Sequence, residues 1–254
     1  MSTMPDPMLT RGRRDALVLL LAWAAGSVDA IGFFGLDHVF TANMTGNTVL
    51  LGFSLGQGHG LAAISNVMAL AGFIFGVALG AAIVEKGGKP GVWDRRVTAA
   101  LFLEALMLAA FTFLWHLTPG GPERSSAALY ILIALSALAM GIQSAAVRRL
   151  NLPGVATTYV TGTITSLISG ITRRLHAAEV KATQKESAAA AKPWEHEARL
   201  QTSVFVTYGL SALASGVFQS RVPWLVAVAP LLAVAVVLLV VSLAHRAHES
   251  RPVA

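Results

Sequence analysis

The sequence predicts an all-α integral membrane protein with six transmembrane helices and two short re-entrant half-helices, arranged as an inverted repeat. Three observations predict this fold class. The composition is too apolar for a soluble domain, six apolar segments are long enough to cross a bilayer, and one motif occurs twice. Hydrophobic residues make up 55% of the chain, charged residues make up 13%, and the mean hydropathy is +0.64. A chain of this composition is typical of a membrane protein.

Eight apolar segments follow one another along the chain. Six of them can span a hydrocarbon core of about 30 Å at a rise of about 1.5 Å per helical residue, whereas the second and sixth are short. The first segment follows basic residues that imitate a signal peptide, but it is long enough to be an uncleaved helix. The expected spans are residues 16–36, 61–84, 97–117, 127–147, 202–220 and 223–245, and the short segments are 45–57 and 161–172.

Each short segment opens with the same motif. Thr41–Thr48 is echoed by Thr157–Ile164, and each copy follows an apolar segment with a small-polar element, Gly26–Ala30 in the first half and Gly141–Ala145 in the second. The chain is therefore predicted to be duplicated. In membrane proteins, paired short segments at corresponding places in two halves point to a central binding site.

The distribution of the 19 Lys and Arg residues between the two sides of the membrane favours a topology in which the short segments are re-entrant. If both segments re-enter, 17 basic residues lie on the side of the N-terminus and two, Arg124 and Arg221, lie on the other side; if all eight segments span, the division is 12 to 7. Basic residues are enriched in cytoplasmic loops, so the re-entrant topology with both termini in the cytoplasm is preferred. It also inverts the second half relative to the first. The eight-span alternative stays open, because a short helix can cross a locally thinned bilayer.

This topology predicts the domain organisation, with both termini in the cytoplasm. The one long polar stretch is expected to be a cytosolic loop, partly helical between Leu175 and Ala191 because Ala, Glu, Lys and Gln are good helix formers. Pro193 is expected to end that helix. The predicted divisions are a cytosolic tail at 1–14, a first membrane repeat at 15–118, a second membrane repeat at 126–246 with a cytosolic loop at 173–201, and a cytosolic tail at 247–254.

Two acidic residues are expected inside the membrane. Asp29 lies about 22 Å beyond Arg14 along a continuous helix, and Glu104 lies about 12 Å beyond Arg96. A charged carboxylate at such a depth costs at least about 2.5 to 3.5 kcal/mol, so these residues usually mark a pathway or a proton relay. Asp29 and Glu104 are therefore candidates for proton or ion coupling. The alternative for each is a structural role, in which the side chain ties helices together by hydrogen bonds.

The repeated motifs predict a solute site. They place polar side chains and a glycine at the start of each half-helix, with Thr45 as a capping residue, and helix N-termini present unpaired N–H groups to anions or polar oxygens. The alternative is capping and close packing alone. A packing role is also expected for the stripe of Gly72, Gly76 and Gly80. The predicted solute-binding residues are Asn43, Thr45, Gly46, Asn47, Thr161, Gly162 and Thr163.

Several classes of function are excluded or disfavoured. The absence of cysteine excludes disulfides and thiolate metal sites. Gly52–Gly56 matches the pattern of a nucleophile elbow but lies in an apolar helix, so no catalytic residue, metal site or cofactor is predicted. The net charge of +6 does not indicate a nucleic-acid partner, because no basic face with interleaved aromatic residues is present.

The quoted elements resemble the YoaK-like family of bacterial multipass membrane proteins, which has no assigned biochemical function. The resemblance rests on Ala25–Ala30, Phe40–Thr48, Gly141–Ala146 and Leu152–Thr163, and it extends over about residues 13–244. It implies a multi-pass protein of the bacterial inner (plasma) membrane and brings no substrate or mechanism. The leading hypothesis is a transporter or channel for a small polar or anionic solute. The alternative is a non-transporting membrane protein that binds a partner or lipid through its cytosolic loop. The expected partners are the lipid bilayer and the solute. Assembly of several copies of this chain into a homo-oligomer stays open.

Overall fold

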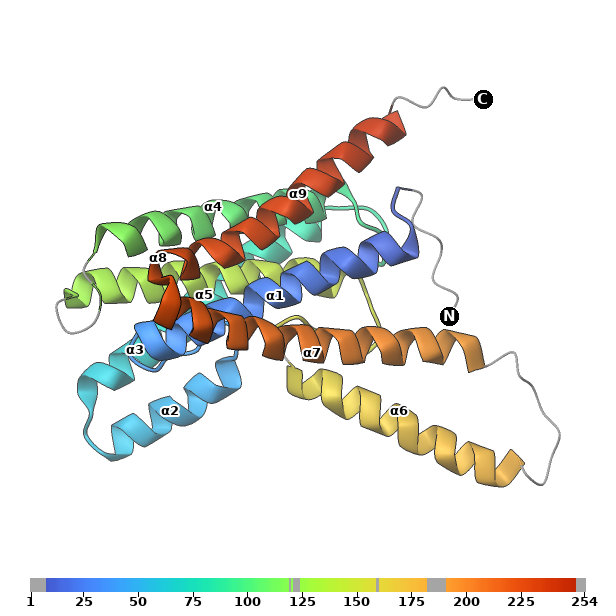
Figure 1. Ribbon diagram of the computed structural model, residues 1–254, viewed down its shortest axis with the longest axis horizontal. Helices are drawn as coiled ribbons and strands as arrows, with labels where there is room; N and C mark the ends of the chain where they lie inside the picture. Colours follow the sequence, from blue (N-terminus) through green and yellow to red (C-terminus); the bar gives the residue numbers. More distant parts are fainter. Residues whose placement is uncertain (1–7, 119, 121–123, 159, 182–190, 250–254) are drawn as a thin grey trace.

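All regular secondary structure in the described residues is helical (Figure 1). The computed structural model describes residues 8–118, 120, 124–158, 160–181 and 191–249. Parts of the expected cytosolic tails and loop, at 1–7, 182–190 and 250–254, lie outside the described residues. The helices are α1 (Arg11–Gly35), α2 (Met44–Gly56), α3 (Gly60–Val84), α4 (Arg95–Leu117), α5 (Ser126–Arg149), α6 (Val160–Lys181), α7 (Ala191–Arg221), α8 (Pro223–Val226) and α9 (Val228–Glu249).

Within the described residues, five helical segments are long and apolar enough to cross a membrane. They are α1, α3, α4, α5 and the segment Pro223–His248, which joins α8 to α9. The sixth expected span, residues 202–220, lies within α7. This helix has 31 residues and is therefore about 46 Å long, but it is not among the five.

The chain reverses direction after α1 and again after α5. Asp37 and His38 follow α1 with φ angles of +60° and +59°, and Asn151 and Gly154 follow α5 with φ angles of +49° and +63°. Such left-handed conformations turn the chain sharply. After each reversal the chain returns to the middle of the bundle, where α2 and α6 begin. These two helices then run toward opposite ends of the molecule (Figure 1).

The helix contacts form matching pairs. Helix α3 packs along α5 and α7 packs along α1; α4 packs on α5 and α9 packs on α1; α2 contacts α3 and α6 contacts α7. Glycines lie where the backbones approach most closely. A Cβ atom on Gly76 would overlap the carbonyl oxygen of Leu138, and one on Gly72 would lie 2.9 Å from the carbonyl oxygen of Ala134. The packing role expected for the α3 glycines is therefore confirmed.

Two expected boundaries in the second half are wrong. Helix α2 agrees with its expected range to within one residue, but α6 continues to Lys181 instead of ending at 172. Helix α7 begins at Ala191, so Pro193 lies in the first turn of a helix and does not end one. The first turn tolerates proline because its missing N–H would have no helical partner there. Much of the expected cytosolic loop at 173–201 is therefore helical.

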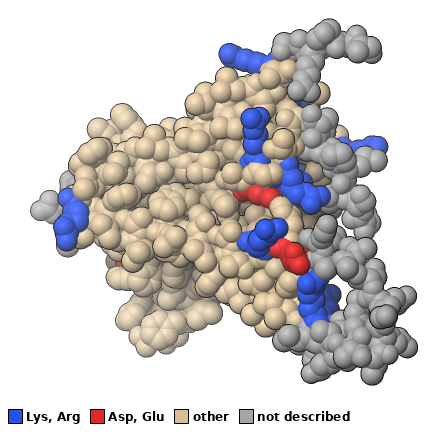
Figure 2. Space-filling view, turned by 45° about the vertical axis from the view of Figure 1, so that its right-hand side comes forward, with Lys and Arg blue, Asp and Glu red and all other residues tan. Residues whose placement is uncertain are grey.

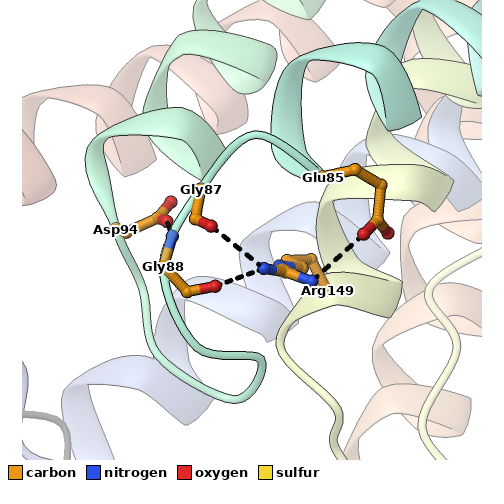
Figure 3. A network of polar contacts seen from close by, with 5 residues as sticks. All are labelled: Glu85, Gly87, Gly88, Asp94 and Arg149. Carbon is orange, nitrogen blue, oxygen red and sulfur yellow. Dashed lines mark hydrogen bonds and ion pairs between the residues drawn. The ribbon is translucent and has the colours of Figure 1, made fainter.

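The loop between α3 and α4 is fastened to the end of α5 by Arg149 (Figure 3). Its guanidinium forms an ion pair with Glu85 at 3.3 Å and donates to the carbonyl oxygens of Gly87, at 3.4 Å, and Gly88. Asp94 accepts the Gly88 N–H at 3.0 Å and also caps the first turn of α4. The end of α3, the start of α4 and the end of α5 therefore lie together.

The end of α9 lies at the same end of the bundle. His245 Nε2 lies 3.2 Å from Thr98 Oγ1 in the first turns of α4. Figure 2 shows Lys and Arg gathered mainly at one end of the molecule, with a smaller group at the opposite end. The basic end is the one where α1 begins and α9 ends (Figure 1).

Candidate functional site

Asp29 fixes the chain that returns from α1 to α2. Its buried carboxylate accepts the backbone N–H groups of Thr41 at 2.8 Å, Ala42 at 2.6 Å and Asn43 at 3.2 Å, all on Oδ1. The other oxygen, Oδ2, accepts the hydroxyl of Tyr208 on α7. A carboxylate with four donors is well satisfied inside a protein. Asp29 therefore holds the non-helical segment against α1, as the structural alternative for this residue describes.

The start of α2 is held by the residues that were expected to bind solute. Asn47 is buried and binds the backbone of Phe40, accepting its N–H at 2.9 Å and donating to its carbonyl oxygen at 2.5 Å. Asn43 caps the helix by accepting the Gly46 N–H at 3.4 Å, so the capping residue is Asn43 and not Thr45. A Cβ atom on Gly46 would lie 2.8 Å from the Phe40 ring.

The second half repeats this contact at the start of α6. Thr163 is buried, and its hydroxyl contacts the backbone nitrogen of Ala156 at 3.3 Å and the carbonyl oxygen at 3.5 Å. Thr163 and Asn47 each bind the residue seven positions earlier. Thr161 is exposed and Gly162 is half-buried.

Helix α5 holds the second returning segment as α1 holds the first. Gln143 is fully buried and donates to Thr157 Oγ1 at 2.9 Å and to the carbonyl oxygen of Leu21 at 3.1 Å. The hydroxyl of Ser144 is hydrogen-bonded to that of Thr158. The second returning segment is thus bound by the neutral side chains of Gln143 and Ser144, whereas the first is bound by the carboxylate of Asp29.

A cavity of about 580 Å³ lies where the two returning segments meet. Its polar lining consists of hydroxyls, an amide and one guanidinium. Its apolar lining comes from α3, α5, the segment after α5, and Ala42 and Met44 at the start of α2. Arg148, at the end of α5, is exposed, so the cavity reaches the surface there. The polar lining residues are Thr45, Ser144, Arg148, Asn151, Thr157 and Thr158.

Thr45 is the only one of the seven predicted solute-binding residues that lines this cavity. Asn47 and Thr163 are turned toward their own backbones, and Gly46 faces Phe40. The prediction did not name the other polar lining residues, or Tyr208, as site residues. The repeat itself contained a signal, because Thr157 and Thr158 open the second motif.

Glu104 lies apart from this cavity. Its side chain on α4 is fully buried, and neither carboxylate oxygen has a hydrogen-bond partner among the described residues. It is surrounded on its own helix by the buried residues Leu101 and Leu108. The two expected coupling residues therefore differ in environment: among the described residues, Asp29 has four donors and Glu104 has none.

The fold and the site define a multipass helical membrane protein with a partly polar cavity between two non-helical segments. The chain belongs to the family described as proteins of unknown function DUF1275, whose model matches residues 17–243. It is 40% identical over 168 residues to the "UPF0700 transmembrane protein YoaK" of Bacillus subtilis (strain 168), a match that covers 66% of this chain and 72% of that protein. No solved structure matches the chain. The resemblance inferred from the motifs is confirmed.

Proposed function

We propose that the protein carries a small polar or anionic solute across the bacterial inner membrane, as a transporter or channel. The observation that supports this function best is the cavity of about 580 Å³ at the junction of the two returning segments. The hydroxyls of Thr45, Thr157 and Thr158 line it, and a hydroxyl can both donate and accept hydrogen bonds. Arg148 has no ion-pair partner among the described residues, so it adds an attraction for anions.

The proposal includes an inverted repeat, in which the second half of the chain has the same helix order as the first but the opposite orientation in the membrane. In this arrangement α1, α2, α3 and α4 correspond to α5, α6, α7 and α9, and α7 is the sixth span. The matching helix contacts support it, since exchanging the halves converts the contact of α3 with α5 into that of α7 with α1. The opposite directions of α2 and α6 support it as well (Figure 1). Non-helical backbone at this depth is tolerated where it is buried in protein or lines a polar cavity.

The proposed orientation places the basic end in the cytoplasm. The contact between Thr98 and His245 argues for re-entrant half-helices, because the eight-span alternative puts the start of α4 and the end of α9 on opposite sides. Arg124, one of the two basic residues expected outside, donates to the Gly35 carbonyl oxygen at 2.8 Å, at the far end of α1. With this orientation the cavity opens to the cytoplasm near Arg148.

Asp29 takes part in this proposal through its bond to Tyr208. Protonation of Asp29 would weaken the hydrogen bond that Oδ2 accepts from Tyr208, because a neutral carboxyl group is a weaker acceptor than a carboxylate. Coupling through Asp29 would therefore loosen the contact between α1 and α7. In the same movement the segment at Thr41 and Ala42, which Asp29 holds, would become free to shift beside Thr45.

The experiment is a flux assay with the purified full-length protein in liposomes. The panel contains small anions, such as formate, nitrate and phosphate, and neutral polar solutes, such as glycerol and urea. We expect flux above that of protein-free liposomes for at least one solute. Val155→Trp fills the cavity with an indole ring and should abolish this flux.

The matched control is Val67→Trp. Val67 is 48% exposed on α3 and does not line the cavity, so the same substitution there should leave the flux unchanged. Absence of flux for every solute, with correctly folded protein in the liposomes, would favour the alternative. That alternative is a non-transporting membrane protein that binds a partner or lipid through residues 173–201.

A further inference from the structure

Glu104 is a fully buried carboxyl group in the core of the bundle, and no described residue forms a hydrogen bond with either of its oxygens. Helix α4 packs on α5 and α9. The buried side chains that α9 contributes to the same hydrophobic core include Val234, Val237 and Val241. Among the described residues, this environment supplies no hydrogen bond to a negative charge on Glu104.

No cation is bound to Glu104 from the helices packed around it. Helix α3 carries no ionisable residue. The described ionisable side chains of the other elements lie toward helix ends: Tyr130, Arg148 and Arg149 on α5; His245, Arg246 and His248 on α9; Arg95, Arg96 and His116 on α4 itself.

The ionisable group of α9 with a known contact on α4 is His245. It contacts Thr98, which lies six residues before Glu104 and therefore about 9 Å away along the helix. Asp29 on α1 is bound by Tyr208 and three backbone N–H groups. A charged Glu104 would therefore be uncompensated, and an isolated ionised carboxylate in an apolar environment is far less stable than the neutral acid.

We propose that Glu104 is a proton-binding site in the bundle core, occupied by a proton in the structure described here, and that its loss and uptake of a proton accompany solute movement. The second part rests on the proposed function; the first part does not. The chemistry is a single proton transfer. A water molecule that reaches the core when the helices separate takes the proton from one carboxyl oxygen and later returns it, and no other bond changes.

The first experiment reads out the proton itself. Dicyclohexylcarbodiimide reacts with protonated carboxyl groups in apolar surroundings, and the acid O–H adds across one N=C bond to give a stable N-acylurea after rearrangement. We expect mass spectrometry of the full-length protein in detergent to show one adduct on Glu104. The adduct should decrease as the pH of the reaction is raised, because the reagent requires the proton.

Two carboxyl groups of the same protein are internal controls. Asp29 is also buried but has four donors, and Glu85 is exposed, with a side chain 69% accessible. Both should remain largely unmodified, and Glu104→Gln should eliminate the adduct. Lack of modification of Glu104 at every pH tested, or modification of Asp29 to the same extent, would overturn the proton site.

The second experiment tests coupling. In liposomes that contain the wild-type protein and show solute flux, a pH gradient should drive accumulation of the solute inside the liposomes. Glu104→Gln, a permanent neutral analogue of the acid, should keep solute exchange at equal pH and lose the response to the gradient. An unchanged response would refute coupling and leave the proton site standing. Absence of flux in the wild type would refute the proposed function, while the labelling result would still decide the proton site.

Discussion

Tyr208 on α7 donates a hydrogen bond to Asp29 on α1, across 179 positions of the chain. The contact joins the two halves of the protein at the place where their helices approach closely. Gly26 lies opposite Tyr208, and a Cβ atom on it would lie 2.5 Å from the Tyr208 carbonyl oxygen. In the other half, Gly141 lies in the same relation to Phe73, which has no hydroxyl and lines the cavity. One junction is thus hydrogen-bonded through Asp29, whereas its counterpart is closely packed and places an apolar ring beside the cavity.

Tyr208→Phe removes the hydroxyl and keeps the ring. We expect a loss of about 1 to 3 kcal/mol in stability, because Asp29 Oδ2 is left buried without a donor. Thermal unfolding in detergent measures it. The control is Tyr130→Phe on α5, where the same change is made at a half-buried position that makes no such contact. Equal stability of the two variants would show that the bond between Tyr208 and Asp29 contributes nothing.

Gly76→Ala should destabilise the contact between α3 and α5. The new methyl group would overlap the carbonyl oxygen of Leu138, and overpacking of this kind costs about 1 to 3 kcal/mol. Gly52→Ala on α2 is the matched control, because no atom lies within 4 Å of the added Cβ. Melting temperatures of the two variants should therefore separate, with only Gly76→Ala lowered. A stable Gly76→Ala variant would mean that the helices can move apart without penalty.

Thr45→Val tests the one residue that the sequence and the cavity both select. It removes a lining hydroxyl at nearly constant volume, so solute flux at limiting concentration should fall roughly fivefold, the equivalent of about 1 kcal/mol for one hydrogen bond. Stability should change by less than about 0.5 kcal/mol. Thr161→Val is the control, since Thr161 holds the corresponding place in the second motif and is exposed like Thr45 but does not line the cavity. Equal effects at both positions would favour a site shared by the two motifs, as the duplication alone predicts.

Single cysteines test the topology, because the natural chain has none. A cysteine at His59, in the exposed turn between α2 and α3, should react with a membrane-impermeant maleimide in intact cells. A cysteine at Lys89, in the loop between α3 and α4, should react only after permeabilisation. Labelling of Lys89 from outside would establish the eight-span alternative and reverse the proposed orientation.

The sequence alone determined the helices that depend on length and hydropathy. The apolar parts of α1, α3, α4 and α5 follow from apolar runs of 21 or more residues between basic or polar positions, because such runs have one stable environment. The start of α1 does not, since the helix begins at Arg11 and the apolar run at 16. The start of α2 followed from the motif. The end of α6 and the start of α7 could not be read in this way, since an Ala-, Lys- and Glu-rich segment is compatible with both helix and loop, and its neighbours decide between them.

The partners of the polar residues were decided only by the tertiary structure. The motif identified Asn47 and Thr163 as polar residues at helix starts, but the chain reversals at Asp37 and Asn151 turn them toward their own backbones. Tyr208 reaches Asp29 because α7 packs on α1, and nothing within either helix indicates that pairing. Depth in the membrane follows from position along one helix. A hydrogen bond follows from which distant segment is brought within about 3 Å, and that is a property of the whole packed bundle.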